Sequence, residues 1–372
     1  MGSDARARPG VTRRDTHTPP PPIPPADTLW RAMPVSRLLD CGMDYADVLA
    51  LQRATAAGQA WDVAAEQLAN AQLDRADAAE RDGSPVTAAE AYRAAVACLV
   101  FAQMAYNFDG QRKRDLYARL TAATHRAGAL AEPGWQRLEL PFARGSLFGW
   151  LIRPAARPRG TVVVFGGQSG WGAAYLRQAD ALAQRGVAAL LAEGPGQGES
   201  RMVGGLRLDV DVRAAYSRFV DHLAVHPELG PGIGLWGNSL GGLYAATTAA
   251  SDPRVAAVCV NGAPAHPRLL RFRTFAEQAA AMLGTEDPDA IQRNFDRIAL
   301  RPRDHLDCPL LVLHGGADPI VALEDQQPFL VAAGNAATLR VWADGEHTIY
   351  NHADERTAFV ADWFAERFPV RA

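Results

Sequence analysis

The sequence has few cysteines, a single lysine (Lys113), no marked excess of either charge and no long apolar run. Its 38 basic and 41 acidic side chains give a formal net charge of −3, which excludes a polyanion binder that works through bulk charge. Its longest apolar runs, residues 96–102 and 162–165, are too short to span a bilayer. Arg13 and Arg14 precede polar residues and prolines, where a signal peptide needs an apolar stretch. We therefore expect a cytoplasmic protein with no membrane or nucleic-acid partner.

The four cysteines are far apart in the sequence, which argues against both a metal site and a disulfide framework. They lie at positions Cys41, Cys98, Cys259 and Cys308. Such a pattern is typical of free, buried thiols. No group of histidine and acidic residues has the spacing of metal ligands either, so we expect no metal and no organic cofactor.

The N-terminal third of the chain differs in pattern from the rest. Residues 1–27 are polar and proline-rich, and we expect them to form a disordered arm. Residues 28–132 carry no strand signal and are predicted to form a helical N-terminal cap domain. Apolar residues recur there at helical spacing in four stretches, at 44–57, 60–80, 85–107 and 111–130.

Residues 133–372 alternate between strand and helix signals, which predicts a mostly parallel sheet with helices on both faces. A hairpin at 137–142 and 147–153 precedes strands at 161–165, 187–192, 232–236, 255–260, 309–314 and 339–342. Several of these strands are continuous apolar runs, as expected for strands buried on both faces. The fold class is therefore α/β, preceded by an all-α region.

The strongest functional signal is the sequence Gly237-Asn238-Ser239-Leu240-Gly241. An apolar strand precedes it and a run of helix formers follows it, which is the context of a nucleophile elbow. Glycines are needed on either side of the serine because larger side chains would collide in so tight a turn. Ser239 is thus the predicted nucleophile.

An acid and a base follow the serine in the order that this arrangement requires. Asp318 comes just after the strand at 309–314, and His347 comes after the last strand. Neutral His347 would take the serine proton, and Asp318 would fix its tautomer and stabilise the imidazolium. The nearest competitors for these two roles are His352, His314 and Asp307.

Backbone N–H groups are expected to stabilise the oxyanion that forms when the serine attacks. One donor is the N–H of Leu240, and the other comes from the loop after the strand at 161–165. There we favour the N–H of Gln168, with that of Gly167 as second choice. The glycine-rich stretch 193–200 lacks the order of a phosphate-binding loop, and we interpret it as a rigid loop beside the catalytic face.

Together these features resemble the α/β-hydrolase superfamily over roughly residues 137–372. The helical region ahead of the core, the stretch 194–199 and the sequence Gly-Glu-His at 345–347 resemble one group in particular. That group contains the 2,6-dihydroxypseudooxynicotine hydrolase, fungal hydrolases that shorten pigment polyketides and, more distantly, FrsA-like esterases. The resemblance implies that Ser239, Asp318 and His347 are a catalytic triad, and it leaves open a homodimer formed through the helical region.

The substrate is expected to be an aromatic or polyketide-like small molecule. Residues 264–304 separate two core strands and are predicted to form a small helical lid, with Phe272 and Phe275 facing the substrate together with Trp171. The group's chemistry implies hydrolysis of a C–C bond next to a ketone. A carboxylesterase, a thioesterase or an acyltransferase in secondary metabolism would use the same triad, and a non-catalytic binding protein is a third alternative.

Overall fold

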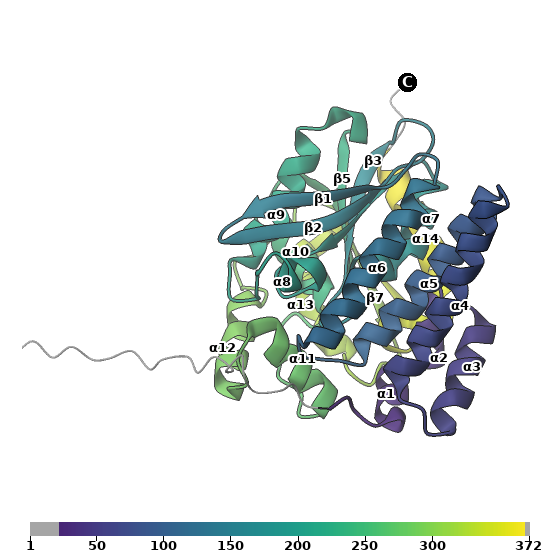
Figure 1. Cartoon of the computed structure of the whole chain (residues 1–372). Coiled ribbons are helices and arrows are strands. Elements are labelled where there is room, and N and C mark those ends of the chain that lie inside the picture. The colour runs from purple at the N-terminus through teal and green to yellow at the C-terminus, as the bar shows by residue number, and fades with distance from the viewer. Residues whose placement is uncertain (1–21, 369–372) are drawn as a thin grey trace, which may run out of the picture.

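The computed structural model describes residues 22–368, in which an eight-stranded sheet is packed between helices on both faces (Figure 1). Six helices come first: α1 (Ala26–Ala32), α2 (Val35–Asp40), α3 (Tyr45–Ala56), α4 (Trp61–Arg81), α5 (Pro85–Met104) and α6 (Gln111–Ala129). The four longer ones match the predicted helical stretches. The short α1 and α2 were not predicted, and α1 begins inside the arm expected at 1–27. Residues 1–21 of that arm lie outside the described residues.

All eight strands occur where the sequence predicts them. They are β1 (Gln136–Phe142), β2 (Gly145–Ile152), β3 (Gly160–Phe165), β4 (Ala188–Glu193), β5 (Gly232–Asn238), β6 (Val255–Asn261), β7 (Leu310–Gly315) and β8 (Ala337–Trp342). Their order across the sheet is β1-β2-β4-β3-β5-β6-β7-β8. The pairs β1–β2 and β2–β4 are antiparallel, and the remaining pairs are parallel. The predicted α/β class is confirmed.

The remaining helices connect these strands. They are η1 (Gly172–Tyr175), α7 (Leu176–Ala183), α8 (Gly198–Met202), α9 (Val212–Ala224), η2 (Pro227–Leu229), α10 (Leu240–Ala249), α11 (Arg273–Leu283), α12 (Pro288–Ile298), α13 (Leu323–Ala333), η3 (Gly334–Ala336), η4 (His347–His352) and α14 (Ala353–Arg367). Helices α11 and α12 both fall inside the stretch predicted to be a lid.

Alternate residues of the central strands contribute to two hydrophobic clusters, one on each face of the sheet. In β3, Val162 and Val164 pack with α7, α14 and the N-terminal helices, whereas Val163 and Phe165 pack with α9, α10 and α13. Helices α4, α5 and α6 run side by side next to the first of these faces (Figure 1). The N-terminal helices therefore share a continuous apolar core with the sheet.

Helix α5 is long and apolar enough to cross a membrane, by length and composition alone, which the sequence analysis did not anticipate. However, 67% of its apolar window is buried inside the protein. It packs between α4 and α6, as a core helix does.

The four cysteines are free thiols, of which Cys98 and Cys259 are buried and Cys41 and Cys308 are half-buried. Within residues 22–368, no group of three or more histidine, cysteine or acidic side chains is arranged to hold a metal ion.

Candidate active site

Ser239 occupies a strained turn between β5 and α10. Its φ is 54° and its ψ is −136°, a conformation that an L-residue rarely adopts. The flanking glycines make this turn feasible. A Cβ on Gly237 would lie 2.0 Å from the carbonyl oxygen of Gly241, and one on Gly241 would lie 2.5 Å from the carbonyl oxygen of Gly166. The steric reason for the motif in the sequence is thus visible in the structure.

The three side chains predicted to act together form a hydrogen-bonded chain. Nε2 of His347 lies 3.0 Å from Oγ of Ser239, and Nδ1 of the same ring lies 2.8 Å from Oδ2 of Asp318. These residues come from three segments, at the ends of β5, β7 and β8, which meet at the carboxyl edge of the parallel strands. With Nδ1 protonated toward the carboxylate, Nε2 is free to accept the serine proton.

The Asp318 carboxylate is fixed on both oxygens. Its side chain is 1% exposed, and Oδ1 accepts hydrogen bonds from the N–H groups of Ile320 at 2.8 Å and Val321 at 3.1 Å. Because Oδ1 is occupied in this way, Oδ2 is held toward the imidazole. An acceptor so positioned orients the ring and stabilises its charged form.

The loop that carries His347 is supported by residues that the sequence analysis missed. Thr348 has a φ of 52°, and its carbonyl accepts hydrogen bonds from Nδ2 of Asn261 at 3.1 Å and Nη1 of Arg356 at 2.9 Å. Arg356 is itself buried and forms a two-point ion pair with Asp40 of α2, at 2.6 and 3.2 Å. A helix of the N-terminal region therefore helps to hold the segment that presents the imidazole.

The competing candidates lie elsewhere. His314 is buried, and its Nδ1 lies 2.8 Å from the side-chain oxygen of Gln326. His352 is paired with Asp344 at the end of η4, at 2.9 Å. Asp307 is exposed and lies 3.3 Å from His305. The side chain that pairs with the Ser239 hydroxyl is that of His347, not one of these three.

The predicted oxyanion donors lie next to the serine. A Cβ on Gly167 would lie 2.7 Å from the N atom of Leu240 and 3.1 Å from Oγ of Ser239, so the loop after β3 closes directly over the nucleophile. Among the described residues, the N–H groups of Leu240 and Gln168 have no hydrogen-bond acceptor. Two unpaired N–H groups beside a nucleophile are the arrangement that binds a tetrahedral oxyanion.

The glycine-rich stretch 193–200 supports this loop through one side chain. Gln197 is fully buried, and its Nε2 donates to the carbonyl of Gly166 at 2.7 Å and to that of Gly167 at 2.9 Å. Its Oε1 accepts from the N–H of Gly194 at 2.9 Å and from the hydroxyl of Tyr216 at 3.2 Å. The stretch therefore lies against the loop after β3, and the Gln197 side chain joins the two by hydrogen bonds.

The first residue of this stretch carries a buried carboxyl group. Glu193 accepts a hydrogen bond from the Tyr117 hydroxyl and another from the N–H of Glu199 at 2.5 Å. Burial, followed by the negative charge of Glu199, raises the pKa of Glu193 to about 8. The group therefore favours its protonated form near neutral pH.

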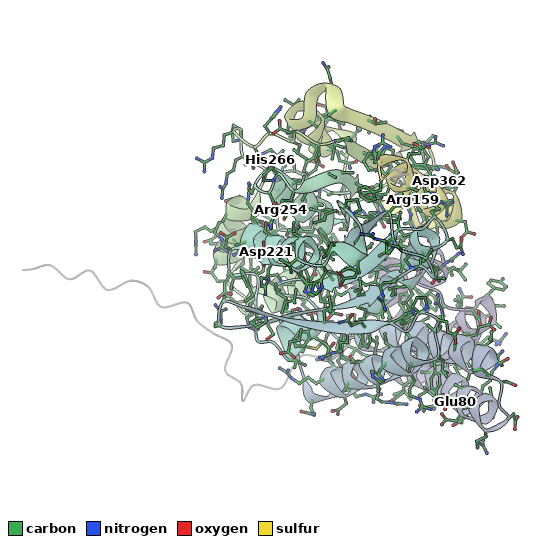
Figure 2. The ribbon with its side chains drawn as sticks, turned by 90° about the horizontal axis from the view of Figure 1, so that it is seen from above. Glu80, Arg159, Asp221, Arg254, His266 and Asp362 are labelled. Atoms are coloured by element: carbon green, nitrogen blue, oxygen red, sulfur yellow. The ribbon has the colours of Figure 1, made fainter. Side chains whose placement is uncertain are left out.

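Ser239 opens into a cavity of about 140 Å³. Its lining is mainly apolar and includes a few polar side chains. Besides Ser239 it consists of Gln168, Leu240, Pro264, His266, Pro267, Arg268, Leu270, Phe275, Phe295, Ile320, Val321 and Asp325. His266 lies on the opposite side of the molecule from Glu80, which marks the end of α4 (Figure 2). The cavity is thus on the side of residues 264–304, away from that tip of the helical region.

Two of the three predicted pocket residues do not line this cavity. Phe275 does line it, but Phe272 is 49% exposed and packs on the outside of Phe275. Phe272 is the residue just before α11. Trp171 is buried in a neighbouring cluster and donates to the carbonyl of Gly167 at 3.3 Å. It therefore supports the loop after β3 that carries Gly167 and Gln168, called the oxyanion loop below.

The fold and the arrangement of Ser239, His347 and Asp318 are those of an α/β-hydrolase, and comparison with known proteins agrees. Residues 156–294 match a family model described as serine aminopeptidase, S33. The chain is an α/β-hydrolase, and it is an enzyme of that superfamily.

Within the superfamily, the chain is similar to members of the group that the sequence resemblance indicated. It is 28% identical to the 2,6-dihydropseudooxynicotine hydrolase of Paenarthrobacter nicotinovorans over 303 residues, which cover 80% of this chain and 81% of the relative. The crystal structure of a 2,6-dihydroxy-pseudo-oxynicotine hydrolase superposes with a TM-score of 0.80 at 25% identity, over 90% of this chain and 95% of that one. A structure of AbyA5 shares the fold, with a TM-score of 0.62 at 21% identity over 81% of this chain and 88% of that one.

Proposed function

We propose that this α/β-hydrolase forms an acyl-enzyme on Ser239, with His347 as the base and Asp318 as its partner, and hydrolyses a C–C bond next to a ketone. The observation that carries the proposal is the unbroken hydrogen-bonded chain from Asp318 through His347 to Ser239. The C–C specificity is supported by the similarity to the 2,6-dihydroxy-pseudo-oxynicotine hydrolase over most of both chains.

The reaction begins when His347 takes the proton of the Ser239 hydroxyl as the oxygen attacks the ketone carbon. The negative charge moves to the former ketone oxygen, which the N–H groups of Leu240 and Gln168 stabilise. When the tetrahedral intermediate collapses, the C–C bond breaks and its electron pair leaves with the departing carbon as an enolate. The His347 imidazolium returns its proton to that carbon. Water, deprotonated by the same imidazole, then releases a carboxylic acid from the serine.

The cavity supports a compact, apolar substrate. Phe275, Phe295 and Leu270 give it aromatic and aliphatic walls, and His266 and Arg268 add polar groups. Helices α11 and α12 contribute Phe275 and Phe295, and we propose that they act as the lid of the site. An aromatic or polyketide-like diketone matches this lining.

The test compares an aryl 1,3-diketone with a p-nitrophenyl ester of the same acyl group. The proposal expects release of a carboxylic acid from the diketone, with loss of turnover of both substrates in Ser239→Ala. If the ester turns over rapidly and no diketone is cleaved, the triad stands and the chemistry is that of an esterase or thioesterase. If Ser239→Ala retains diketone cleavage, the acyl-enzyme mechanism is wrong.

A further inference from the structure

A second, small cavity adjoins the oxyanion loop and carries chemistry that the triad does not use. Its volume is about 10 Å³, which is room for one water-sized group such as a single oxygen atom. Gln168 lines both this cavity and the cavity of Ser239. Lys113 of α6 and Arg201 of α8 also line it, so the N-terminal helices and the hydrolase core both contribute cations.

Three of the side chains that line this cavity carry N–H groups without a full set of acceptors. Lys113 is 2% exposed, and its Nζ donates to the carbonyls of Gln103 at 3.3 Å and Tyr106 at 2.5 Å, which leaves one of three N–H bonds. Arg201 is 5% exposed, and its Nε has no hydrogen-bond partner. The side-chain Nε2 of Gln168 has none either. Buried N–H groups without an acceptor cost free energy, so the cavity is suited to bind an oxygen atom.

The charges favour a negatively charged oxygen. Nη2 of Arg201 lies 2.9 Å from the Asp109 carboxylate, and both cations lie over the ring of Trp171, at 5.0 Å for Arg201 and 5.4 Å for Lys113. Burial, together with the positive charge of Arg201, lowers the pKa of Lys113 to about 7. A bound anion would stabilise the charged ammonium and interact with both cations.

We infer that this cavity binds the second oxygen of a 1,3-dicarbonyl substrate, the oxygen that becomes an enolate when the acyl group passes to Ser239. The inference rests on the proposed C–C hydrolase function and names the substrate class of the same site. As the C–C bond breaks, its electron pair forms a C=C bond and the second carbonyl oxygen takes the negative charge. That oxygen then accepts hydrogen bonds from Lys113, Arg201 and the side chain of Gln168. The backbone N–H of Gln168 donates instead to the oxygen of the ketone that Ser239 attacks.

This inference can be tested by measuring how tightly an enolate binds to a variant of the protein that cannot cleave it. The probe is 5,5-dimethylcyclohexane-1,3-dione, an ionised cyclic enolate at neutral pH, and 3,3-dimethylcyclohexanone is its neutral analogue with one oxygen. Titration calorimetry on Ser239→Ala should show that the dione binds more tightly than the ketone. In the same background, Lys113→Met should weaken dione binding by about tenfold or more, since a charge-assisted hydrogen bond is lost.

Two further variants keep the test decisive. Arg114→Gln removes a neighbouring exposed cation that bonds to the Met202 carbonyl, and it should leave dione binding unchanged. Arg201→Lys keeps the positive charge but loses the guanidinium donors, and it should weaken dione binding even if Lys113→Met folds poorly. Equal affinities for dione and ketone, or equal losses of both in the variants, would overturn the inference.

Failure of the inference and failure of the proposed function remain distinguishable. The proposed function is tested by diketone cleavage and by covalent labelling of Ser239 with a fluorophosphonate, both in the protein without substitutions. If cleavage and labelling occur but the dione does not distinguish Lys113→Met from its parent, the enolate site is wrong and the triad stands.

Discussion

Replacing Gln197 with alanine should impair catalysis through a residue that does not touch the nucleophile. The side chain is fully buried and makes four hydrogen bonds, two of which hold the carbonyls of Gly166 and Gly167. Those glycines precede Gln168, whose N–H is an expected oxyanion donor. Alanine removes all four hydrogen bonds and leaves a void beside the loop.

The size of the effect follows from these contacts. Each buried polar group left without a partner costs about 1–3 kcal/mol, and Gln197→Ala leaves three of them (the Gly166 carbonyl, the Gly194 N–H and the Tyr216 hydroxyl), so it should lower the free energy of unfolding by about 3 kcal/mol or more. If the loop relaxes far enough to withdraw the Gln168 N–H, transition-state stabilisation falls by about 3 kcal/mol, which corresponds to a decrease in kcat of about a hundredfold. KM should change much less, because the apolar cavity walls stay in place.

The assay is steady-state hydrolysis of a p-nitrophenyl ester, well below the melting temperature of the variant. Thr161→Val is the matched control. This substitution removes a buried hydrogen bond from Oγ1 of Thr161 to the carbonyl of Leu229, at 2.8 Å. Thr161 lies at the start of β3, whereas the oxyanion loop follows the end of that strand. The control should lose stability with kcat nearly unchanged. If Gln197→Ala also keeps kcat within about twofold of the unaltered protein, the oxyanion loop does not depend on Gln197.

Three further predictions concern charged side chains. Arg356→Met should lower the free energy of unfolding by about 3–5 kcal/mol, since it leaves the buried Asp40 carboxylate unpaired, and adding Asp40→Leu should recover most of the loss in urea unfolding. If the double variant is no more stable than the single one, that reasoning fails. Glu193, whose pKa is raised from 4.5 to about 8, contributes stability that is fully present below pH 4.5 and is lost as pH rises through about 8. The melting temperature of Glu193→Gln should therefore fall less with pH across that interval than that of the unaltered protein, and parallel curves would contradict this. Asp318→Asn should reduce kcat for an ester by up to about 10⁴-fold, because the amide cannot stabilise the His347 imidazolium, and a loss below tenfold would show that another group holds the ring.

The strands and the elbow were predictable because their signals are local. The short run Val162–Phe165 is apolar at every position, as a strand buried on both faces requires, and the glycines around Ser239 indicate a turn too tight for larger side chains. Asp318 and His347 were found because each follows a recognisable strand, and parallel strands end at one edge of the sheet.

The residues that support the site could not be read in the same way. Gln197 and Arg356 act through partners that lie far away in sequence, so that no local pattern marks them; the partner of Arg356 is Asp40, 316 positions away. The helix containing Asp40 spans only six residues, which is too short for apolar periodicity to appear. Phe272 and Phe275 could not be told apart by sequence, because which of them faces the cavity depends on where α11 begins.

Labelling of the serine tests the central claim most directly. A fluorophosphonate reacts with a serine whose hydroxyl is activated by a neighbouring base, and intact-mass and peptide analysis then locate the adduct. The account predicts a single adduct on Ser239, abolished in Ser239→Ala and strongly slowed in His347→Ala. An unlabelled Ser239 in the folded protein, or labelling that proceeds at the same rate without His347, would contradict it.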